Sequence, residues 1–157
     1  MKKLTALMLA ALMLAALISA FTSCGELESP PAYMPAVRYE NVPLENLTLM
    51  IQWGSGPADG GGPAFGMTAG EALKANADGV PYAVIGDGDL KIVNGSDKNA
   101  RFDTKFEGVF TKDGELTDHK ESDLSSLPSG KYVVAFSVTK QMKDRDEEYY
   151  VFTGIEK

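Results

Sequence analysis

The sequence predicts a mainly β domain of antiparallel strands with one short helix. Three observations support this class. Short runs that alternate apolar and polar residues fill the chain after Pro81, clusters of Gly, Asn and Asp separate the runs, and a helix-start signal precedes only the stretch 69–77. Without an N-terminal signal of 23 residues, 134 of the 157 residues remain, enough for one compact domain but not for two.

The first strand is predicted from Leu47 to Trp53, where apolar residues alternate with Thr, Met and Gln. We expect Leu47, Leu49, Ile51 and Trp53 to face inward, with this single tryptophan in the core or at its edge. Segment 54–66 then carries many Gly and Pro residues, without the spacing of a dinucleotide fingerprint or a P-loop. It predicts a flexible surface loop.

A short helix is predicted over 69–77. Thr68-Ala-Gly-Glu71 has the pattern of a capping box, and Asp78-Gly79 closes the stretch. Its apolar face is mostly alanine, so we expect this helix to cover an edge of the sheet. Gly70 weakens the helix locally.

From Pro81 onward the pattern is that of β-strands. Runs are expected at 82–85, 90–93 and 101–111, with a short piece near Leu116, and the turn signals between them favour antiparallel hairpins. Phe102, Phe106 and Phe110 share one parity, which predicts that all three project to the same side, into the core. Two further strands, 131–139 and 148–155, are expected to form a long terminal hairpin around a charged loop at 140–147.

The last third of the chain resembles a known class of modules. Leu124-Ser-Ser-Leu127-Pro-Ser-Gly130-Lys-Tyr132-Val-Val134, with Tyr149-Tyr-Val-Phe152, is similar to the closing hairpin of bacterial immunoglobulin-like and fibronectin-like sandwiches. The resemblance implies an antiparallel immunoglobulin-like sandwich in which Tyr132 fixes a corner between the sheets. The loop and helix between Gly54 and Gly79 depart from a plain seven-strand arrangement.

The N-terminus has the order of an export signal. Lys2 and Lys3 precede an apolar run, Leu4–Ile18, which small or weakly polar residues follow. As a helix this run would span roughly 22 Å, less than the roughly 30 Å hydrocarbon core of a bilayer. A cleaved signal is therefore expected in preference to a transmembrane helix.

Phe21-Thr22-Ser23-Cys24-Gly25 resembles the lipobox of bacterial lipoproteins. The resemblance implies that the Cys24 thiol is diacylglycerylated, that the signal is cut before it, and that fatty acyl chains such as palmitate hold the protein on the membrane. Phe21 departs from the family, which more often has Leu there. An uncleaved anchor and ordinary secretion are the open alternatives.

Cys24 is also the only cysteine, so in an exported protein it would otherwise be an unpaired thiol. Segment 24–46 contains four prolines and predicts a tether to a single domain at 47–157. The loss of Lys2 and Lys3 leaves 13 basic and 22 acidic side chains, a net charge of −9. This charge argues against a nucleic-acid partner.

Candidate catalytic and metal sites are few in the sequence. His119, the only histidine, lies in a polar connector, and no Gly-x-Ser-x-Gly elbow is present. Asp87 with Asp89, and the acidic segment 144–148, offer oxygen ligands for Ca²⁺ but lack the spacing of an EF-hand loop. We expect no catalytic residue, no metal and no cofactor.

These observations predict an extracytoplasmic lipoprotein, anchored to the cell membrane through Cys24, with a non-catalytic module that binds a protein or ligand at the cell envelope. One alternative is a small exported protease inhibitor of sandwich fold, and another is a small enzyme.

Overall fold

The computed structural model describes residues 34–54 and 60–157. It contains a helix, α2 (Ala69–Ala75), and two 3₁₀ turns, η1 (Ala77–Gly79) and η2 (Glu121–Ser126). The strands are β1 (Ala36–Tyr39), β2 (Val42–Pro43), β3 (Leu47–Trp53), β4 (Tyr82–Val84), β5 (Leu90–Val93), β6 (Arg101–Thr111), β7 (Lys131–Gln141) and β8 (Asp146–Glu156).

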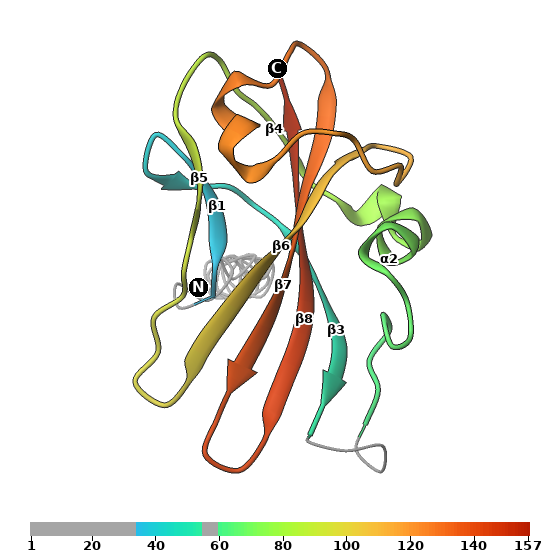
Figure 1. Cartoon of the computed structure of the whole chain (residues 1–157), viewed down its shortest axis with the longest axis vertical. Helices are drawn as coiled ribbons and strands as arrows, with labels where there is room; N and C mark the ends of the chain where they lie inside the picture. Colours follow the sequence, from blue (N-terminus) through green and yellow to red (C-terminus); the bar gives the residue numbers. More distant parts are fainter. Residues whose placement is uncertain (1–33, 55–59) are drawn as a thin grey trace, which may run out of the picture.

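The strands form two sheets (Figure 1). The large sheet has the order β3-β8-β7-β6, with all neighbours antiparallel. Strand β4 continues the edge beyond β3 and pairs with β8 in parallel. The small sheet has the order β2-β1-β5 and is antiparallel throughout.

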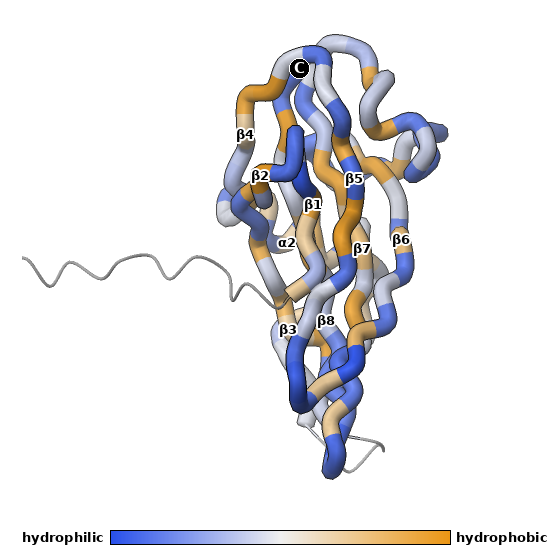
Figure 2. Tube along the Cα trace, turned by 90° about the vertical axis from the view of Figure 1, so that its left-hand side faces the viewer, coloured by the Kyte–Doolittle hydropathy of each residue, from blue (hydrophilic) through white to orange (hydrophobic). Residues whose placement is uncertain are grey.

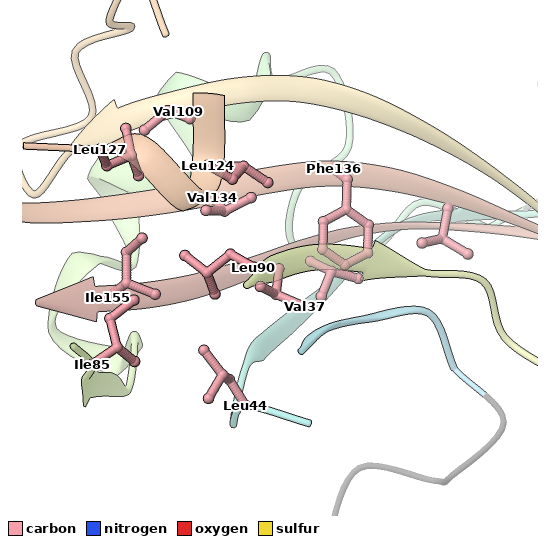
Figure 3. Packing of buried hydrophobic residues seen from close by; sticks show 12 residues of the cluster. Val37, Leu44, Ile85, Leu90, Val109, Leu124, Leu127, Val134, Phe136 and Ile155 are labelled. Atoms are coloured by element: carbon pink, nitrogen blue, oxygen red, sulfur yellow. The ribbon is translucent and has the colours of Figure 1, made fainter. Parts of the chain in front are cut away.

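Both faces of the large sheet are covered. One face packs on the small sheet and η2 and encloses what we term the inter-sheet core, part of which is seen in Figure 3. The other face packs on α2 and the segment before it and encloses the helix-side core. Alternate residues of β7 supply the two cores: Val134 and Phe136 belong to the inter-sheet core, and Val133 and Ala135 to the helix-side core.

The predicted class is confirmed: within residues 34–54 and 60–157 the fold is mainly β, with largely antiparallel sheets packed as a sandwich and one short α-helix. The terminal hairpin is longer than expected. Its strands pair as far as Gln141 and Asp146, and Met142 closes the turn by donating its N–H to the Arg145 carbonyl at 3.0 Å. In Figure 2 the end of the domain that contains the β7–β8 turn, at the bottom of the picture, is mainly hydrophilic, while hydrophobic stretches lie within the strands.

The prediction that three phenylalanines of β6 share one side is wrong. Phe106 pairs with Phe136 and Gly108 with Ala135, so an extra residue, Glu107, bulges out of the ladder. The bulge reverses the side that the following residues face. Phe106 therefore packs against the inter-sheet core, while Phe110 belongs to the helix-side core.

A second bulge corrects the prediction for Trp53. The register of β3 shifts between Met50 and Gln52, so Trp53 pairs with Glu147 and lies on the opposite face from Leu49, which pairs with Tyr150. The indole is 43% exposed and lies against Gly60. Leu47, Leu49 and Ile51 are half-buried against the helix-side core, as expected.

Two predicted hairpins are replaced by crossings between the sheets. The turn at 86–89 joins β4 of the large sheet to β5 of the small sheet, and the turn at 94–97 leads from β5 back to β6. Of the three turn signals between residues 86 and 115, the one at 112–115 forms a tight hairpin: Thr111 donates its N–H to the Glu115 carbonyl at 2.8 Å, and Phe110 bridges to Leu116.

Part of the expected tether belongs to the folded domain. Residues 36–43 form β1 and β2, and the Val37 side chain is completely buried in the inter-sheet core. The domain therefore begins before residue 47. The two prolines of this part, Pro35 and Pro43, lie just before β1 and at the end of the sheet-edge strand β2, positions that need no ladder hydrogen bond from proline.

Candidate functional site

A groove lies between α2 and the end of β6, on the helix side of the large sheet. We term it the α2 groove. Its volume is about 490 Å³, and it is lined by Thr68, Ala69, Gly70, Glu71, Lys74, Glu107, Phe110, Gly114 and Leu116. These residues come from two parts of the chain that lie far apart in the sequence, 68–74 and 107–116.

The helical wall is fixed by the predicted capping box. Glu71 donates its backbone N–H to the Thr68 hydroxyl at 3.3 Å, while its carboxylate accepts the Thr68 N–H and hydroxyl, each at 2.8 Å. These bonds, the backbone one first, lower the pKa of Glu71. The α2 groove therefore has a permanently ionised carboxylate at its helical rim at neutral pH.

Two glycines bring the walls together. A Cβ at Gly114 would lie 2.9 Å from the Gly70 carbonyl oxygen, and a Cβ at Gly70 would lie 3.1 Å from the Gly114 carbonyl oxygen. Gly114 also has φ +80, which favours glycine. Gly70, unfavourable for an isolated helix, thus leaves room for the close approach of α2 to the 112–115 turn.

The floor and the outer rim of the α2 groove are apolar. Phe110 is buried at the base, whereas Leu116 is 64% exposed and lies over Gly108, where a Cβ would overlap its Cδ1 atom. Two further exposed apolar side chains, Phe65 and Met67, occupy the segment leading into α2. A substantial apolar surface therefore faces solvent on this side of the sheet.

The strand-side rim carries a second carboxylate. Glu107 accepts a hydrogen bond from the Ser137 hydroxyl at 2.7 Å and pairs with Lys105 at 3.1 Å. Tyr150 lies close by and donates its hydroxyl to the Met67 carbonyl at 3.0 Å. Burial, and then the nearby Glu107 carboxylate, raise the pKa of Tyr150.

The His119 side chain packs against an aromatic ring, that of Tyr132. Its ring meets Tyr132 edge-on, with centroids 5.8 Å apart and an interplanar angle of 86°. Its backbone N–H donates to the Thr117 hydroxyl at 3.3 Å.

The acidic pairs considered for calcium are engaged with cations. The Lys157 ammonium lies 3.8 Å from Asp87, and Lys91 lies 3.5 Å from Asp89. In the terminal hairpin, Glu147 is buried and pairs with Arg145 at 2.8 Å. Within 34–54 and 60–157, no group of three or more His, Cys, Asp or Glu side chains is arranged to hold a metal ion.

The second half of the expected flexible loop is hydrogen-bonded to β3. Trp53 donates its N–H to Gly60 at 2.9 Å, and Gly62 donates to Ile51 at 2.8 Å. Ala64 follows and is completely buried. Segment 60–64 therefore lies along the β3 edge rather than moving freely; residues 55–59 lie outside the described part, as does Cys24, the predicted lipidation site.

Sequence reasoning missed the α2 groove. The available signals were Gly70 inside a predicted helix and the apolar Leu116 in an otherwise polar segment. Among the residues that the structure describes, no helix is long and apolar enough to cross a membrane. Comparisons of the chain with protein-family models, curated proteins and solved structures find no match.

Proposed function

We propose that this chain is a lipid-anchored binding protein of the bacterial cell envelope, and that the α2 groove is its binding surface. The proposed anchor is supported by the lipobox-like sequence Phe21-Thr22-Ser23-Cys24-Gly25, which follows a basic head and an apolar run. One acyl group alone gives only marginal membrane binding, whereas the two or three chains of a lipoprotein hold it stably.

The position of the groove suits a tethered module. The tether would join the domain at β1, which belongs to the small sheet. The α2 groove lies on the opposite face of the large sheet, over the helix-side core. A protein held by its N-terminus thus presents the groove away from the face that carries its tether.

The chemistry of the groove favours an extended segment of a partner protein with an apolar side chain next to a basic one. Phe110 and Leu116 offer an apolar seat, and the Glu71 and Glu107 carboxylates stand at the two rims. Lys74 lies at the far end of α2 and would oppose a second basic residue there. Apolar anchors with a charged rim are the usual form of such interfaces.

The anchor is tested by metabolic labelling with a fatty acid. Cys24→Ser should abolish labelling and leave an unprocessed precursor, while the control Ser23→Ala, which keeps a small residue before the cysteine, should be labelled and processed. Labelling of Cys24→Ser at the wild-type level would refute the anchor.

The groove is tested separately by a photo-crosslinking amino acid placed in living cells at Leu116 or, as control, at Val42. The two side chains are equally exposed, at 64% and 63%, but lie on opposite sides of the fold. We expect adducts from position 116 alone, on partner peptides with an apolar residue beside Lys or Arg. Equal adducts from both positions would contradict the groove without affecting the anchor.

A further inference from the structure

Among the described residues, none pairs with the outer edge of β6 over its first seven residues. In the large sheet, β6 is the terminal strand, and its first part lies at the lower left of the sheet in Figure 1. Its last part is covered, because Thr117 donates its N–H to the Val109 carbonyl at 2.8 Å and Leu116 bridges to Phe110. No described strand pairs with the outer edge of 101–107.

This open segment has two chemically distinct faces. On the helix side, its charges alternate in sign: Arg101, Asp103, Lys105 and Glu107. On the other face, Phe102 and Phe106 pack against the inter-sheet core, with Thr104 between them. Exposed edge strands with charged residues resist random pairing, yet a complementary strand can still add to them.

We propose that this edge pairs with the same edge of a second copy of the chain, antiparallel and centred on Thr104. In that register Arg101 stands opposite Glu107, Asp103 opposite Lys105, and Phe102 opposite Phe106. The two-fold axis repeats each of these pairs, so the interface contains two of each. Each charged residue therefore faces a residue of opposite charge, and each phenylalanine faces a phenylalanine. Cross-strand pairs of both kinds stabilise antiparallel sheets.

Pairings centred one residue before or after Thr104 place like charges opposite each other. Centring on Asp103 sets that residue opposite its own copy and Arg101 opposite Lys105. Centring on Lys105 sets that lysine opposite its copy and Asp103 opposite Glu107. A shift of one residue turns the aromatic face of one copy toward the charged face of the other.

Two details of the single chain agree with this pairing. Among the described residues, Arg101 and Asp103 form no ion pair, so both are available to a partner strand. The Thr104 hydroxyl is buried without a hydrogen-bond partner in the described part of one copy, and the proposed axis passes through this residue. Lys105 already pairs with Glu107 of its own strand, so the dimer would extend an existing ladder of alternating charge.

Charge reversal tests the register. The masses of the whole protein and its variants would be measured by sedimentation in density-matched detergent over a range of concentrations. Asp103→Lys or Lys105→Asp alone places like charges opposite each other in both symmetry-related pairs of residues 103 and 105. We expect each substitution to weaken self-association at least about tenfold. The combined variant Asp103→Lys/Lys105→Asp restores both pairs, as does an equimolar mixture of the two single variants, so both should associate like the wild type.

Asp144→Lys is the matched control, since Asp144 is exposed in the β7–β8 turn and the charge change is the same. It should leave association unchanged. A wild-type protein that stays monomeric at millimolar concentration would overturn the proposal. So would a dimer that ignores both single reversals, or one that the combined variant does not restore, because such a dimer would use another surface.

Discussion

Phe106 and Phe110 face opposite sides of the large sheet, although they lie only four residues apart on one strand. The bulge at Glu107 and Gly108 separates them and reverses the alternation. Gly108 has φ +144, a conformation that side chains rarely adopt, and Leu116 occupies the space where its Cβ would lie. One glycine thus lets β6 contribute an aromatic side chain to each core.

Gly108→Ala should therefore destabilise the fold by about 1–3 kcal/mol, chiefly because alanine rarely adopts φ +144, whereas the exposed Leu116 side chain can move away from the new Cβ. Chemical denaturation measures the change in the free energy of unfolding. Gly79→Ala is the control, since a Cβ there would meet Leu47 at an ordinary 3.6 Å. Equal effects of the two substitutions would show that the bulge is not conformationally demanding.

The capping box makes stability depend on acid pH. Because the pKa of Glu71 is lowered in the folded state, its contribution is complete above its unfolded pKa and is lost as the pH falls through the folded value. The difference in unfolding free energy between wild type and Glu71→Gln should shrink between about pH 6 and about pH 3. The same comparison with Glu45→Gln, an exposed residue outside any cap, provides the control. A difference for Glu71→Gln that stays constant over this range would contradict the role of its charge.

We expect alkaline pH to lower the stability of the fold through ionisation of Tyr82. Burial raises the pKa of its phenol, and the nearby Lys131 ammonium, 5.7 Å from the ring centre, opposes the shift. A raised pKa means that stability is complete below the unfolded value, near 10, and is lost as the pH rises through the folded value. Tyr82→Phe cannot ionise, so its melting temperature should fall less than that of the wild type above about pH 10. Parallel curves for the two proteins would contradict this assignment.

The buried carboxylate of Glu147 holds the lower end of the terminal hairpin. It accepts the Tyr149 hydroxyl at 2.7 Å and pairs with Arg145 at 2.8 Å, and Lys140 lies 3.9 Å away. Glu147→Ala removes the buried carboxylate from the Lys140 ammonium, whose side chain is 15% exposed, and should cost about 3 kcal/mol. Arg145→Ala removes only a half-exposed cation and should cost less than about 1 kcal/mol. Similar costs in urea denaturation would show that burial does not strengthen the interaction.

Features set by nearby residues could be predicted from the sequence. The Thr68–Glu71 capping box and the period-two alternation of β7 and β8 depend on residues within a few positions of one another, and both are confirmed. Features set by tertiary contacts could not. The bulge at Glu107 is defined by how β6 pairs with β7, and β1 forms within a proline-rich segment because β5 pairs with it.

The α2 groove could not be predicted from the sequence because it, too, depends on tertiary contacts. Thr68 and Leu116 are 48 positions apart and line one groove because two glycines allow α2 to approach the 112–115 turn. No local pattern encodes that approach. Gly70 was visible in the sequence only as a weakness in the helix, whereas in the fold it is the point of contact.

The most direct test of the proposed anchor is the mass of the N-terminal peptide of the mature protein, purified from the membrane fraction of bacteria that express the full chain. We expect this peptide to begin at Cys24 and to carry a diacylglyceryl group on its sulfur. A peptide that begins elsewhere, or an unmodified Cys24, would contradict it.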